Sequence, residues 1–175
     1  MAIKHSREVF VQLLSNLRHG SEPTTKIFKE IREAALDPEI QEALAARVLL
    51  SNQINARLDQ CFKLIGEQPM KASGHLYDCL AEDFRRGLAE IQNPVAWHLF
   101  ILAKATHLIH VRIAEYVALI SAADVSGNYG VGPLLERCLA DKFALAERMR
   151  GLIRKVVESK VFEHSSEATI TRPAA

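Results

Sequence analysis

The chain has 175 residues, with 22 Lys and Arg against 21 Asp and Glu and a net charge of +1. This length fits one compact domain. The balanced charge excludes a general electrostatic field for holding nucleic acid or an anionic membrane. Apolar residues make up 49% and aromatic residues only 6%, a composition typical of a helical protein.

The three cysteines are an odd number, and none belongs to a CxxC pair. This spacing is unlike that of a disulfide framework and fits a reducing compartment. The start of the chain lacks the pattern of a secretory signal, and the longest apolar runs, such as LFILA at 99–103, are far shorter than a membrane span. We therefore expect a cytoplasmic protein without a transmembrane segment, in which Cys61 and Cys138 are small apolar core residues.

The first predicted helix begins near Arg7, with apolar residues at helical spacing as far as Leu17. The segment RHGSEPTT at 18–25 interrupts this pattern, so a break or kink is expected there. Ser21 suits the N-cap of a restarted helix that continues to about Ala35, because serine side chains accept hydrogen bonds from first-turn amides.

Three further long helices are predicted over 38–65, 95–120 and 133–157, and a shorter helix fills the connection between the first two of these. With a connection this long, the second and third main helices run parallel, as in the ferritin-like variant of the four-helix bundle. We therefore predict an all-α, ferritin-like four-helix bundle over residues 1–158, with a long crossover that contains a short extra helix. Residues 159–175 form a polar C-terminal tail that need not fold.

Several motifs of the chain occur in the same order in a known family. They are LDPEIQEAL, ARLDQCFKLIGEQP, LYDCLAED, the stretch from NP at 93–94 to IAEY at 113–116, and LLERCLADK. In this order they resemble the YciF-like family of ferritin-like bacterial stress proteins. The resemblance implies a bundle fold, a role in stress physiology and, in most members, inward Glu side chains arranged as in di-iron carboxylate proteins.

The positions that the resemblance assigns to these carboxylates carry other residue types here. They fall on or beside Ser21, with Glu22 as the nearest carboxylate, on Leu50, on Ile109 and Arg112, and on Lys142, while His110 is the polar residue retained on the third main helix. At about 100° per residue, Lys142 also lies on the inner stripe of its predicted helix. Because a protonated amine repels a dication, we expect no metal and no cofactor.

The stretch HLIHVRIAEY offers His107 and His110 as a candidate metal pair, since two imidazoles on one helix can share a metal. Their directions differ by about 60°, and apolar residues surround them, so we expect no metal there. His107 is instead expected on the polar edge with Lys104 and Glu115, and His110 as a packed, hydrogen-bonded residue.

Arg112 and Lys142 allow two interpretations. In one, their stems cover apolar surface while their heads reach water. In the other, they occupy the former metal cavity and hold an anion or pair with a remaining carboxylate such as Glu22. The candidate ligand or charge-pair site therefore comprises Lys142, Arg112, His110 and Glu22, with no catalytic and no metal-binding residue.

The leading hypothesis is a non-catalytic bundle that has lost its di-metal site and acts as a structural or interaction protein in bacterial stress response. The apolar third helix suggests burial against a protein partner, most simply a second copy in a homodimer, and neither nucleic acid nor a membrane is expected. One alternative is a di-iron or di-manganese oxidase or iron-handling protein with displaced ligands such as Glu22, His110 and Glu115. The other is a bundle that binds a small anion or other ligand near Lys142, Arg112 and His110.

Overall fold

The computed structural model describes residues 5–71 and 75–168, with side chains as far as residue 159. Within these residues every regular element is helical, in agreement with the predicted all-α class. The elements are α1 (Ser6–His19), α2 (Ser21–Ala34), α3 (Pro38–Ile65), α4 (Leu76–Glu90), α5 (Pro94–Val125), the short 3-10 helix η1 (Tyr129–Val131) and α6 (Gly132–Ala168).

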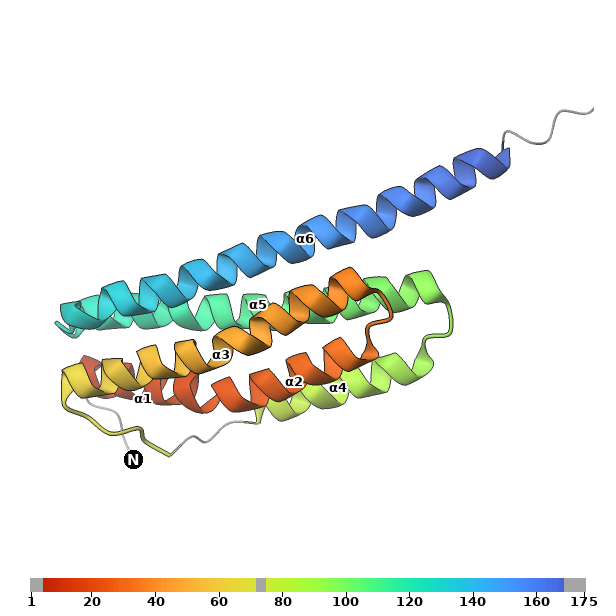
Figure 1. Ribbon diagram of the computed structural model, residues 1–175. Coiled ribbons are helices and arrows are strands. Elements are labelled where there is room, and N and C mark those ends of the chain that lie inside the picture. The colour runs from red at the N-terminus through yellow and green to blue at the C-terminus, as the bar shows by residue number, and fades with distance from the viewer. Residues whose placement is uncertain (1–4, 72–74, 169–175) are drawn as a thin grey trace, which may run out of the picture.

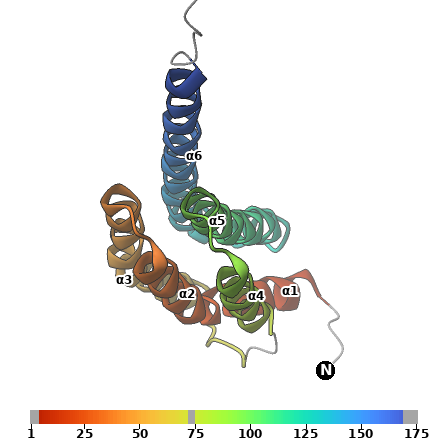
Figure 2. The ribbon, with the colours of Figure 1, turned by 90° about the vertical axis from the view of Figure 1, so that its right-hand side faces the viewer.

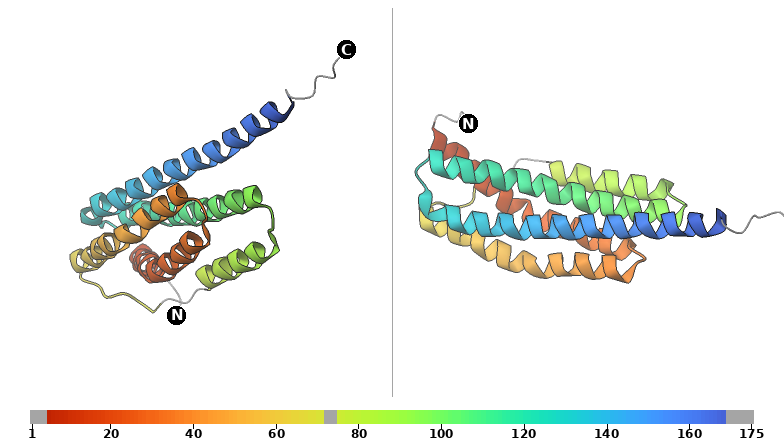
Figure 3. Two further views of the ribbon diagram at one scale, coloured as in Figure 1. Left: turned by 45° about the vertical axis from the view of Figure 1, so that its right-hand side comes forward. Right: turned by 90° about the horizontal axis from the view of Figure 1, so that it is seen from above.

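Four main helices lie along one another, and the first of them is divided into α1 and α2 (Figure 1). α3 runs back against α1 and α2, α5 runs in the same direction as α3, and α6 returns along α5 (Figures 1 and 3). The connection from α3 to α5 must therefore travel the length of the bundle. α4 makes this return while packed on α2 and α5 (Figure 2). This arrangement confirms the predicted ferritin-like connectivity with a short extra helix in the crossover.

Local sequence signals set the ends of the helices that flank the crossover. At the start of α3, Asp37 Oδ1 accepts hydrogen bonds from the amides of Glu39 and Ile40, at 2.7 and 3.1 Å. Asn93 caps α5 in the same way, and a proline follows each cap. Gly66 ends α3 with a φ of +70°, a left-handed conformation that glycine adopts without a steric penalty. The predicted bounds of α3, residues 38–65, are confirmed, because Asp37 and Gly66 fix its two ends.

The break between α1 and α2 is centred on Gly20, inside the predicted interruption. Gly20 has right-handed helical backbone angles, which any residue can adopt. Glycine is needed here because it has no side chain. A Cβ there would lie 2.9 Å from Arg112 Nη1 and closer still to the Tyr77 ring. Ser21 is not the N-cap that was predicted, because it is the first residue of α2 and follows Gly20 in helical conformation.

α6 is longer than predicted. It continues past residue 157 to Ala168, and residues 169–175 lie outside the described part of the chain. No Gly or Pro occurs between residues 152 and 168, so the sequence there contains no strong helix breaker. The end of α6 extends beyond the other helices (Figure 1). Among the described residues, no helix combines the length and the apolar character needed to cross a bilayer.

Candidate functional site

A layer of buried polar side chains separates two apolar clusters in the middle of the bundle. One cluster includes Phe28, Leu44 and Ile109, and the other includes Leu14 and Leu58. The polar residues lie where one cluster gives way to the other along each main helix. They are Ser21, Thr24, Arg47, Ser51, Arg112 and Lys142. We call these residues the polar layer, and all four main helices contribute to it.

Three members of the polar layer carry basic side chains, and we call them the basic cluster. They are Arg47 on α3, Arg112 on α5 and Lys142 on α6, with exposed fractions of 2%, 1% and 2%. Such burial is rare for Arg and Lys unless they have partners. The heads of Arg112 and Lys142 therefore do not reach water, which favours the second interpretation of these residues.

Arg112 has hydrogen-bond partners for both of its terminal nitrogens. Its Nη1 donates to the Tyr77 hydroxyl at 2.8 Å and to Glu115 Oε2 at 2.7 Å, and its Nη2 donates to the Leu17 carbonyl at 2.9 Å. Burial alone would lower the pKa of Arg112, but the neighbouring Tyr77, Glu115 and Tyr116 outweigh it, and the net shift is upward. The positive charge of Arg112 is thus balanced by Glu115.

Arg47 has no such balance. Its guanidinium lies over the Phe28 ring, 5.3 Å from the ring centroid, but Nε and Nη1 are buried without a hydrogen-bond partner among the described residues. Burial, and then the charge of Arg112, lowers the pKa of Arg47 to about 10. The guanidinium therefore remains charged at neutral pH in an apolar setting.

Lys142 differs from the sequence-based expectation in its charge. Burial first, and then repulsion by Arg47 and Arg112, lowers the pKa of Lys142 to about 6, so at pH 7 the amine is mostly neutral. The adjacent Asp141 forms its ion pair with Arg57, at 2.5 Å between Oδ2 and Nη1. The amine of Lys142 is therefore mostly positively charged only in acidic solution.

Two of the predicted site residues lie outside the polar layer. Glu22 is exposed and pairs with Lys26 at 2.9 Å, and His110 is exposed with its Nδ1 2.9 Å from the Thr106 carbonyl oxygen. Each follows a residue that does face the core, so a turn of about 100° directs it outward. The predictions that Glu22 partners the basic side chains and that His110 is packed are wrong.

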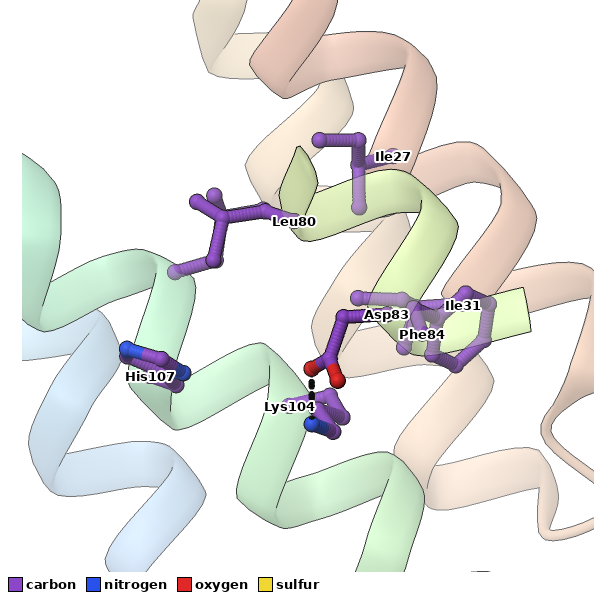
Figure 4. A pocket seen from close by; sticks show the side chains of 8 residues that line it. Ile27, Ile31, Leu80, Asp83, Phe84, Lys104 and His107 are labelled. Atoms are coloured by element: carbon purple, nitrogen blue, oxygen red, sulfur yellow. Dashed lines mark hydrogen bonds and ion pairs between the residues drawn. The ribbon is translucent and has the colours of Figure 1, made fainter. Parts of the chain in front are cut away.

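His107 lies at the surface, as predicted, and lines a small pocket between α2, α4 and α5 (Figure 4). Lys104 forms an ion pair with Asp83 across this pocket. The pocket has a volume of about 10 Å³, which is at most the space of a single water molecule. It is too small to serve as a substrate or cofactor site.

The described residues do not fit a di-metal centre. No group of three or more His, Cys, Asp or Glu side chains among residues 5–71 and 75–159 is placed to hold a metal ion. The displaced ligands considered from the sequence are not brought together, since Glu22 and His110 face outward and Glu115 is held by Arg112 and Tyr77. The layer holds two guanidinium groups, Arg47 and Arg112, where a di-iron centre needs carboxylate or imidazole ligands.

Arg47 was not identified from the sequence, although a signal existed. It stands three residues after Leu44 and four before Ser51, and Ser51 is three before Ile54, so helical spacing places it on the buried stripe of α3. A basic residue on such a stripe is readily assigned to the helix edge, because long side chains can reach water.

Comparison with known proteins agrees with this fold. The model of the family described as Domain of unknown function (DUF892) matches residues 5–162. The chain belongs to this family. No curated protein matches this DUF892 chain.

Three solved structures share the fold of this DUF892 chain. The E. coli stress protein YciF has a TM-score of 0.83 at 20% identity, over 89% of this chain and 99% of that chain. YcfI from Rhodopseudomonas palustris has a TM-score of 0.80 at 22% identity, over 85% and 94%. A protein from Xanthomonas campestris pv. campestris has a TM-score of 0.71 at 20% identity, over 92% and 99%. The resemblance to the YciF-like family is confirmed.

Proposed function

We propose that this DUF892 chain is a non-catalytic, ferritin-like bundle without a metal centre that acts as a structural or interaction protein in a bacterial stress response. The observation that carries the proposal is the basic cluster. Arg47, Arg112 and Lys142 meet between the four main helices, where di-iron bundles gather inward Glu and His ligands. Two guanidinium groups at this point would repel a divalent cation.

The relatives support the biological part of the proposal. YciF of E. coli is a stress protein, and a structural role has been suggested for YcfI of R. palustris. We also propose that the protein is located in the bacterial cytoplasm. Free thiols such as those of Cys61, Cys79 and Cys138 stay reduced there.

Metal content tests this proposal directly. The chain is expressed in medium supplemented with iron and manganese, purified without chelator, and measured by elemental analysis. We expect both metals far below one ion per chain, and the same melting temperature with and without added chelator. One or two iron or manganese ions per chain would instead favour the oxidase or iron-handling alternative.

We also propose that the interaction partner is a second copy of the chain. Phe143 and Val157 are 53% and 48% exposed on α6, and their spacing of two heptads places them on one face of that helix. Because both side chains are exposed, this face is accessible to another molecule. The end of α6 also extends beyond the rest of the bundle (Figure 1). An isologous pairing of α6 helices would cover these side chains in both copies.

A further inference from the structure

The buried charge of Arg47 needs a counter-ion. Two neighbouring carboxylates do not pair with Arg47, because Glu115 is bound by Arg112 and Tyr77, and Asp141 by Arg57. Arg47 forms no ion pair with a described residue, and two of its guanidinium nitrogens are buried without an acceptor. A buried charge left in this state costs several kcal/mol, and the ring of Phe28 offsets only a part of that cost.

Other unused donors lie in the same layer. Arg112 Nε and the Ser21 hydroxyl are buried there without a partner. The Arg112 guanidinium lies 5.8 Å from the centroid of the Tyr116 ring. In line with a shared layer, the charge of Arg112 contributes to the lowered pKa of Arg47, and the charges of both arginines contribute to the lowered pKa of Lys142. The unused groups therefore come from α2, α3 and α5, and an acceptor of hydrogen bonds placed among them would satisfy several at once.

We propose that the polar layer binds one compact inorganic anion, of the size of chloride, against Arg47 and Arg112. The anion must be small because apolar clusters close the layer on both sides. It is monovalent at alkaline pH, since Glu115 already balances Arg112 and Arg47 leaves one charge uncompensated. This inference rests on the proposed loss of the metal centre, and it assigns a ligand of opposite charge to the same place.

Lys142 makes the binding sensitive to pH. It is buried on α6 in the same layer as Arg47 of α3 and Arg112 of α5. The charges of these two arginines act on its pKa, as do Cys138 and Asp141 on its own helix. A nearby anion favours the protonated amine, so binding is accompanied by proton uptake. The anion therefore binds more tightly near pH 6 than near pH 9.

Thermal unfolding in matched salts tests the proposal. The full chain is melted in sodium chloride and in sodium gluconate at equal ionic strength, because gluconate is too large for the layer. We expect chloride to raise the melting temperature by about 3 °C at about 100 mM, with a larger rise at pH 6 than at pH 9. Equal melting temperatures in the two salts would overturn the proposal.

The variant Arg47→Met should lose the chloride effect, whereas Arg85→Met, which removes an exposed arginine paired with Glu30, should keep it. An undiminished chloride effect in Arg47→Met would place the ion elsewhere and reject the site. If Arg47→Met does not fold, crystals of the wild-type chain in sodium bromide decide: an anomalous peak within hydrogen-bonding distance of Arg47 supports the site, and a map without one rejects it. Metal content is measured separately, so a failure here leaves the proposed function standing.

Discussion

Arg47, Arg112 and Lys142 have the same type of charge and similar burial, yet their local partners give them different chemical states. Arg112 is balanced by Glu115 and stays charged. Arg47 stays charged without a balancing carboxylate. Lys142 avoids the cost of a third buried charge by losing its proton, because an amine is far easier to deprotonate than a guanidinium. The charge state of each basic side chain in the polar layer thus depends on the partners that it has there.

Lys142 is predicted to make the stability of the fold depend on pH. Its pKa is 10.5 in the unfolded chain and about 6 in the folded chain. Between these values the unfolded state binds more protons than the folded state, so the free energy of unfolding rises with pH. We expect a contribution of about 1.4 kcal/mol per pH unit between about pH 6 and 9, measured by urea unfolding.

The variant Lys142→Met should lose this slope and be more stable than the wild type at pH 7, since an apolar side chain replaces a buried amine. Lys29→Met, on the exposed side of α2, is the matched control and should keep the slope. Identical pH profiles for the wild type and Lys142→Met would show that Lys142 is not titrating in a buried environment.

At the scale of the elements, the kink between α1 and α2 gives Arg112 access to the first main helix. Gly20 leaves room for the Tyr77 ring and the Arg112 guanidinium, and Arg112 reaches the Leu17 carbonyl of α1. One glycine therefore allows α1, α4 and α5 to meet at the polar layer.

We predict opposite effects of alanine at two helical glycines. Gly20→Ala should lower the free energy of unfolding by about 1–3 kcal/mol, because its Cβ displaces Tyr77 and Arg112. Gly151→Ala should raise it by about 0.5–1 kcal/mol, since no heavy atom lies within 4 Å of the new Cβ and alanine favours a helix. Chemical unfolding measures both, and a stabilising Gly20→Ala would refute the role given to this glycine.

At the scale of the whole molecule, the bundle has two apolar clusters joined through a polar middle. Di-iron bundles also place polar groups inside the four helices, but they use the metal ions to balance carboxylates. In this chain the protein itself supplies the positive charge. A ferritin-like bundle can therefore have a polar centre in which protein side chains carry the positive charge.

The homodimer proposal is tested by molecular mass in solution. We expect size-exclusion chromatography with light scattering to give a dimer at micromolar concentration. The double variant Phe143→Glu with Val157→Glu should be monomeric, because two carboxylates on the α6 face would repel their copies in an isologous interface. Leu64→Glu, at an exposed position of α3, is the control and should stay dimeric. A monomeric wild type would contradict the proposal.

The helices, their order and the connectivity of the bundle could be predicted from the sequence alone. These features depend on signals within a few residues, such as the caps at Asp37 and Asn93 and the left-handed Gly66, together with one long connection. The sequence also indicated that Arg112 and Lys142 stand where the family resemblance places carboxylates.

The contacts between side chains could not be predicted before the helices were packed together. Arg47, the pairing of Arg112 with Glu115 and Tyr77, and the outward direction of Glu22 and His110 depend on contacts between helices that are far apart in the chain. The lowered pKa of Lys142 has the same origin, because burial and neighbouring charges come from other helices. Helical spacing shows which side of a helix a residue occupies, but the charge state of a buried group depends on everything packed around it.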